Sequence, residues 1–169
     1  VQDRIEIDQG TFKKLLERSA FAMAVQDVRY YLNGLLVEVR SNGLRTVATD
    51  GHRLALAETA GIADGEIRRQ VIVPRKGVLE LLRLLQNPDE DVRVVLGGNH
   101  FHAITPDFTF TSKLVDGKFP EYDKVWEDNS LKMVAIFGKY EDGATTSSDA
   151  GIAAWNAFLA QMKTSLGAY

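Results

Sequence analysis

The stretch that decides the fold is RTVATDGHRLALA, at residues 45–57. It predicts a strand at 44–48, a tight turn at 49–52 and a return strand at 53–58. Asp50-Gly51 between two apolar runs indicates a β-hairpin, because glycine adopts a positive φ without steric cost. Turn chemistry does not account for His52 and Arg53, which follow directly. Those two side chains are therefore candidates for function.

The segments on either side of this hairpin predict the same arrangement twice. The first copy has a strand at 5–7, a helix at 11–24 with Asp8 as its N-cap, and strands at 32–40, 44–49 and 53–58. The second has a strand at 70–73, a helix opened by Pro74 and stopped at Asn87-Pro88, and strands at 92–96, 101–105 and 108–112. This doubled β-α-β-β-β pattern predicts an α+β fold.

The last 44 residues, 126–169, have a different pattern and are expected to be separate from a first domain at 1–125. They predict a strand at 131–137, a polar stretch at 138–148 and an amphipathic helix with Trp155, Phe158, Leu159 and Met162 on its apolar face. One strand and one helix cannot bury their own apolar faces. We therefore expect this tail to dock, with self-association between copies as the favoured outcome.

Composition excludes several classes of function. The 169 residues contain no cysteine, which excludes disulfides, cysteine-zinc sites and thiol nucleophiles. The net charge of −3 argues against tight DNA binding, although weak contact through a local basic face is compatible with it. No apolar run approaches the ~20 residues of a membrane span, and the first residues lack the apolar core of a signal peptide. A cytoplasmic protein without a cofactor or a membrane partner is expected.

Two histidine patterns resemble arrangements that carry chemistry. His52 and Asp50 share a turn and Ser112 lies elsewhere, but a catalytic triad is defined by geometry, and no nucleophile elbow supports an esterase. His100 and His102 alternate along one strand without a third ligand at metal spacing. The expectation is therefore a binding protein without catalytic or metal-ligating residues.

Four long strings resemble one family. They are FAMAVQDVRYYLNGLLVEV at 21–39, LRTVATDGHRLALAE at 44–58, VIVPRKGVLELLRLL at 71–85 and FTSKLVDGKFPEYDKV at 110–125. In this order they resemble the middle domain of the bacterial sliding clamp, the beta subunit of DNA polymerase III, over roughly residues 3–125. The resemblance implies two helices on one face of the sheets, lining a ring around DNA, and a role as a polymerase processivity factor. It stops near Trp126.

The resemblance also implies a groove that binds short peptides of polymerases and repair factors. Apolar residues would line it for leucine and phenylalanine side chains, and polar ones would fix the peptide backbone at its rim. The matching positions are Leu32, Thr49, Gly51, His52, Arg53, Leu54, Pro120, Lys124 and Val125. Lys124 stands where the family usually has arginine, so the charge is kept but the planar fork is lost. The far side of the groove belongs to a third domain of the family, so a half-site is expected.

A second implied surface faces duplex DNA. A loop would contribute one arginine and two tyrosines, for phosphate contact and base stacking, and the helices would contribute cations. The candidates are Gln26, Arg29, Tyr30 and Tyr31 in the loop, with Lys13, Lys14, Arg75 and Lys76 on the helices. The alternative to a replication module is an engineered or rearranged chimeric protein whose tail completes a new fold.

Overall fold

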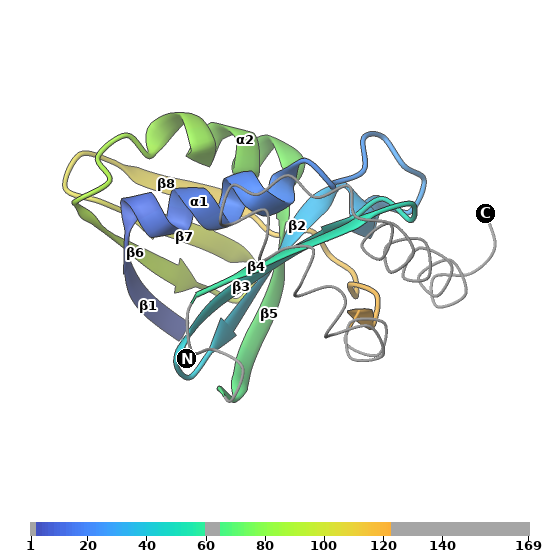
Figure 1. Ribbon diagram of the computed structural model, residues 1–169, viewed down its shortest axis with the longest axis horizontal. Helices are drawn as coiled ribbons and strands as arrows, with labels where there is room; N and C mark the ends of the chain where they lie inside the picture. The colour runs from blue at the N-terminus through green and yellow to red at the C-terminus, as the bar shows by residue number, and fades with distance from the viewer. Residues whose placement is uncertain (1–2, 60–64, 123–169) are drawn as a thin grey trace, which may run out of the picture. The chain divides into compact units, whose positions relative to one another are not determined.

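Two β-α-β-β-β units follow one another in the computed structural model, which describes residues 3–59 and 65–122 (Figure 1). The first unit comprises β1 (Asp3–Asp8), α1 (Gln9–Ala20), the 3-10 turn η1 (Tyr30–Leu32), β2 (Gly34–Arg40), β3 (Gly43–Thr49) and β4 (Leu54–Glu58). The second comprises β5 (Ile67–Pro74), α2 (Arg75–Leu84), β6 (Asp91–Leu96), β7 (His100–Ile104) and β8 (Thr109–Lys113). The predicted α+β class and its doubled order are confirmed. The tail at 126–169, with its expected docking helix and self-association, lies outside the described residues, as do Lys124 and Val125.

Local chemistry explains where the elements begin. The Asp8 carboxylate accepts a hydrogen bond from the Thr11 backbone N–H at 2.8 Å, so it caps α1 as predicted. The Thr11 hydroxyl also donates to this carboxylate, and these bonds lower the pKa of Asp8. The helix ends at Ala20, earlier than the predicted 24. Leu32 was predicted to begin a strand, but it lies in η1 instead because its N–H bonds to the Arg29 carbonyl.

Each unit lends its first strand to the sheet of the other. Sheet A has the order β1-β6-β7-β8, and sheet B has the order β4-β3-β2-β5. Strand β1 pairs antiparallel with β6, and β5 pairs antiparallel with β2. The two units therefore complete one another and form a single body with two sheets.

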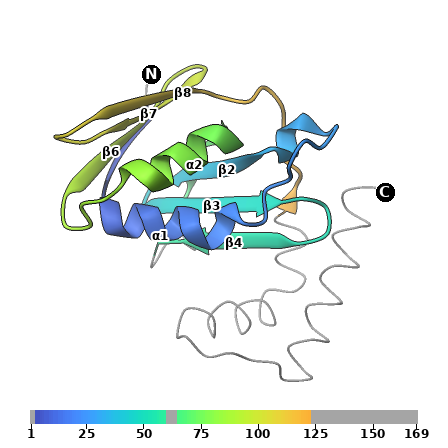
Figure 2. The same ribbon diagram turned by 90° about the horizontal axis from the view of Figure 1, so that it is seen from above.

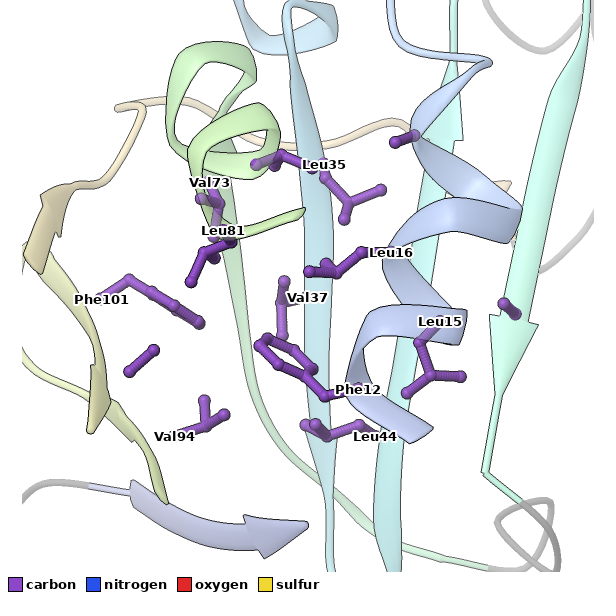
Figure 3. Packing of buried hydrophobic residues seen from close by; sticks show 14 of the residues in the cluster. Phe12, Leu15, Leu16, Leu35, Val37, Leu44, Val73, Leu81, Val94 and Phe101 are labelled. Atoms are coloured by element: carbon purple, nitrogen blue, oxygen red, sulfur yellow. The ribbon is translucent and has the colours of Figure 1, made fainter. Parts of the chain in front are cut away.

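The helices lie side by side against the sheets, as Figure 2 shows. α1 contacts β3 and β4, and α2 contacts β2 and β5. Phe12 of α1 and Phe101 of β7 are fully buried and stack with their ring centroids 6.4 Å apart (Figure 3). Leu81 of α2 and Val37 of β2 belong to the same cluster. Burying a side chain of this size stabilises the fold by about 1.5–3 kcal/mol, so this cluster holds both sheets and both helices together.

The two sheets differ in burial. In sheet A, residues of β1 alternate between half-buried and exposed, and those of β8 between exposed and half-buried. In sheet B, six of the seven residues of β2 and all of β3 are buried. Sheet B is thus buried on both faces along its central strands, whereas sheet A has one face in solvent.

Apart from the two β-α-β-β-β repeats, the chain also divides into two compact parts in space. The first contains residues 1–50 and 54–119, which include every strand and helix named above. The second contains 51–53 and 120–169, of which 51–53 and 120–122 are described. In the second of these parts, the Tyr122 N–H donates to the Pro120 carbonyl at 2.8 Å, which makes a tight turn.

Candidate peptide-binding and DNA-contacting sites

The β3–β4 hairpin positions the first group of candidate residues. Thr49 ends β3 and pairs in register with Leu54, the first residue of β4. Gly51 has a φ of 87°, so the positive φ predicted for the turn is confirmed. His52 and Arg53 follow it and are exposed. Arg53, predicted as a strand residue, lies just before β4 instead.

The apolar members of the proposed groove are already covered in this chain. Leu32 is fully buried and Leu54 is 3% exposed, and the polar Thr49, expected at the rim, is also buried at 1% exposure. Pro120 is half-buried. A peptide would therefore reach Leu32 and Leu54 only after a rearrangement. The rim residues His52 and Arg53 need no such step, because both are exposed in the described structure.

The second group lies in the loop between α1 and β2. We call residues 26–33 the tyrosine loop. Gln26 is exposed and has a φ of 53°, unusual for a residue other than glycine. The rings of Tyr30 and Tyr31 meet edge to face with their centroids 5.8 Å apart. Tyr30 is more than half exposed, so the loop presents an aromatic face to solvent.

The arginine of this loop is bound to a neighbouring carboxylate. Arg29 Nε and Nη2 donate to the two carboxylate oxygens of Asp27 at 2.8 and 2.7 Å. The hydrogen bond to Asp27 raises the pKa of Arg29 above its ordinary value. Both side chains are 20% exposed. A phosphate contact by Arg29 would thus compete with a bidentate ion pair.

The four cationic candidates for DNA contact lie on the two helices, α1 and α2. Lys14 of α1 and Lys76 of α2 are exposed, and Lys13 and Arg75 are half-buried. Arg75 and Lys76 occupy the first turn of α2, where the helix dipole disfavours positive charge. Because the fold bears that cost, these two positions are consistent with a role outside stability.

Three residues that frame the tyrosine loop were not identified from the sequence. They are Asp27, which binds Arg29, Asn33, which bonds across the loop, and Gly117, which lies against both tyrosines. The spacing of Asp27 and Arg29, two residues apart, was a signal for a local ion pair. The approach of Gly117 carries no comparable signal, because it depends on the path of the chain after β8.

The histidines of the two patterns can be placed in the structure. Over the described ranges 3–59 and 65–122, no three His, Cys, Asp or Glu side chains form a group that could hold a metal ion. His100 and His102 stack with centroids 6.3 Å apart, and His102 Nδ1 lies 2.9 Å from the Thr111 hydroxyl. Ser112 Oγ donates to the Lys113 carbonyl at 3.1 Å. In the part of the chain that the structure describes, no helix is long and apolar enough to span a membrane.

Comparison with known proteins places this geometry in one class, the sliding-clamp fold. The family model for the central domain of the DNA polymerase III beta subunit matches residues 6–121. A beta sliding clamp of Pseudomonas putida is 57% identical over 128 residues, which is 76% of this chain and 35% of the relative. The beta sliding clamp of Escherichia coli K12 is 53% identical over 126 residues, covering 75% of this chain and 34% of the relative.

Solved structures agree. The DNA polymerase III subunit beta of Pseudomonas aeruginosa superposes with a TM-score of 0.68 at 56% identity, covering 73% of this chain and 34% of that chain. The chain belongs to the DNA polymerase III beta subunit family, and the part that matches is the central domain. It spans about a third of the length of the curated relatives that it matches.

Proposed function

We propose that this chain acts as a binding module of a DNA polymerase processivity factor, without a reaction of its own. The observation that supports it is the match of residues 6–121 to the central domain of the beta subunit, together with relatives named beta sliding clamps. In this role the module would recognise short peptides of polymerases and repair factors and would contact duplex DNA loosely.

The proposed peptide site centres on the β3–β4 hairpin. His52 and Arg53 would meet the peptide backbone first, because they are exposed. Leu32 and Leu54 would then accept its apolar side chains once they are uncovered. A related clamp from Pseudomonas aeruginosa, 55% identical to this chain with a TM-score of 0.66, has been solved bound to griselimycin. That a relative of this chain binds a ligand supports a binding role for the family's clamps, and the hairpin is our proposal for where a peptide would bind here.

Titration of the full chain with a clamp-recognition peptide tests this site. We expect weak binding and movement of the amide signals of residues 49–54. Replacing the exposed Arg53 with alanine should weaken binding. Arg93→Ala, which removes an exposed arginine from sheet A, is the matched control. If the peptide leaves the signals of 49–54 unmoved, the peptide site is refuted.

The proposed DNA contact is weak and depends on ionic strength. A few phosphate contacts lose affinity steeply as salt rises, and one domain cannot encircle a duplex. We expect the chain to leave circular and linear DNA equally fast at high salt. Retention on circular DNA that is lost after linearisation would show a closed ring and contradict this expectation.

A further inference from the structure

Asn33 joins the two ends of the tyrosine loop through two hydrogen bonds to the backbone of Asp27, an arrangement that we call the bracket. The Asp27 N–H donates to Asn33 Oδ1, and Asn33 Nδ2 donates back to the Asp27 carbonyl, both at 2.9 Å. The Asn33 carbonyl in turn accepts from the Arg75 N–H at 3.0 Å, at the start of α2. The two ends of the loop are therefore joined, and the join is tied to a helix.

The Asp27 side chain extends this bracket to the tyrosines. Its carboxylate accepts three bonds from Arg29, one from the backbone N–H at 2.8 Å and two from the guanidinium. The Arg29 carbonyl then accepts from the Leu32 N–H at 2.9 Å, which closes the turn that contains both tyrosines. Arg29 thus links the bracket to the aromatic pair through its own backbone.

A glycine closes the other side of the aromatic pair. Gly117 has a φ of +146°, a conformation that side-chain-bearing residues rarely adopt. A Cβ placed there would lie 3.3 Å from Tyr30 Cε2 and 3.3 Å from Tyr31 Cβ. The segment before it is held by the Val115 N–H, which donates to the Ile72 carbonyl at 2.9 Å. Gly117 therefore allows a fixed backbone to pack directly on both tyrosines.

From these contacts we propose that Arg29 is a positioning residue of the DNA-contacting loop, not a phosphate ligand. With Asp27, Asn33 and Gly117 it holds the exposed Tyr30 ring ready to stack on an unpaired nucleobase. This inference rests on the proposed DNA contact. It adds the chemical class of the ligand, a single-stranded segment, and identifies residues that act through the tyrosines.

Asp27→Asn, which removes a charge, and Arg29→Lys, which keeps it, separate the two possible roles of Arg29. If Arg29 bound phosphate, removing the competing negative charge with Asp27→Asn would strengthen binding, and Arg29→Lys would preserve most of it. If Arg29 positions the loop, both variants weaken binding and leave the slope of log K against log salt unchanged. A phosphate ligand would lower that slope by about 0.7–0.9 when Arg29→Ala removes it.

The experiment uses the full chain and a fluorescently labelled single-stranded oligonucleotide, with a blunt duplex of the same length as comparison. We expect Tyr30→Ala to weaken single-strand binding about 5- to 150-fold, the range for the loss of one stacked base. Asp27→Asn, Arg29→Lys and Gly117→Ala should each weaken it severalfold. Arg93→Lys, in the exposed ion pair with Glu6, and Gly98→Ala, which has open space around it, should have no effect.

A second readout needs no DNA. Ring signals of Tyr30 and Tyr31 in the free protein should shift in Asp27→Asn, Arg29→Lys and Gly117→Ala, and stay in place in both controls. If the rings shift but no variant binds DNA differently, the positioning holds and the proposed DNA contact fails. If the rings do not shift, or Asp27→Asn binds more tightly, the positioning role of Arg29 is wrong.

Discussion

Sheets A and B are built from the same topology, but they differ in what lies on their outer faces. On sheet A, Glu6 and Arg93 are paired in register at 3.0 Å, and both are more than half exposed. On sheet B, the row Leu56, Val47, Leu36 and Ile72 runs across all four strands, and each of these residues is at most 6% exposed. The Glu6–Arg93 ion pair of sheet A is exposed to solvent, whereas the ion pairs of sheet B lie beside a buried apolar row.

The buried carboxylate of Glu38 on sheet B needs hydrogen-bond partners that an exposed carboxylate does not. Glu38 is fully buried beside the apolar row, and its carboxylate accepts from Arg40 Nε at 2.6 Å and Gln70 Nε2 at 2.7 Å. Arg45 lies 3.9 Å away and also pairs with Glu58 at 2.7 Å. A buried charge is tolerated only when its partners are complete. The same topology therefore carries a solvated pair on one sheet and a closed polar network on the other.

Breaking this network should have the largest effect. Glu38→Ala leaves Arg40 and Arg45 without their shared carboxylate in a buried setting, and we expect a loss of about 3–5 kcal/mol in the free energy of unfolding. Glu6→Ala removes the corresponding carboxylate of sheet A and should cost less than about 1 kcal/mol. Urea denaturation followed by circular dichroism measures both. Equal losses would show that the two faces are alike.

The apolar row gives the next largest effect. Leu36→Ala should cost about 2–5 kcal/mol, because Leu36 is 2% exposed and its removal leaves a cavity. Ile104→Ala, at a half-buried position of sheet A, should cost clearly less. Thermal unfolding of the two variants checks the order. If Ile104→Ala proves the more destabilising, the outer face of sheet B is not the drier one.

The smallest expected effect lies where β1 of sheet A passes into α1. Asp8→Ala should cost about 1 kcal/mol at pH 7, because the N-cap bond to Thr11 is lost. The folded pKa of Asp8 is lowered, so the stability it contributes is present above the unfolded pKa and is lost as pH falls through the folded value. The difference between the wild type and Asp8→Ala should therefore shrink below about pH 4. A difference that persists at pH 2 would contradict the capping role.

The sequence predicted the structure best where a residue's role depends only on its neighbours in the chain. Asp8 as a cap and Gly51 as a positive-φ turn residue were both predicted, since each depends only on its neighbours. The start of β2 was predicted too early at Leu32, because an apolar residue before a strand does not reveal a 3-10 turn. Of the partners that shield Glu38, only Arg40, two residues along β2, had a local signal. The partners Arg45 and Gln70 come from other strands, so only the assembled sheet brings them together.

The candidate sites divide in the same way. The aromatic pair Tyr30-Tyr31 is visible in the sequence, and in the structure the two rings meet edge to face. The bracket by Asn33 and the approach of Gly117 require the path of the chain, so they could not be predicted. The peptide-binding role of the hairpin remains a prediction, as does the DNA-contacting role of the loop.

The exchange of first strands between the two units has a consequence during synthesis. β1 ends at Asp8, but its partner β6 begins only at Asp91. At a translation rate of about 5–20 residues per second, β1 waits roughly 4–17 seconds for that partner to be made. Until then Phe12 and Leu16 of α1 lack much of the core that will cover them. The nascent chain therefore leaves the apolar face of α1 without its full cover for seconds, and a pause before Asp91 would lengthen that exposure.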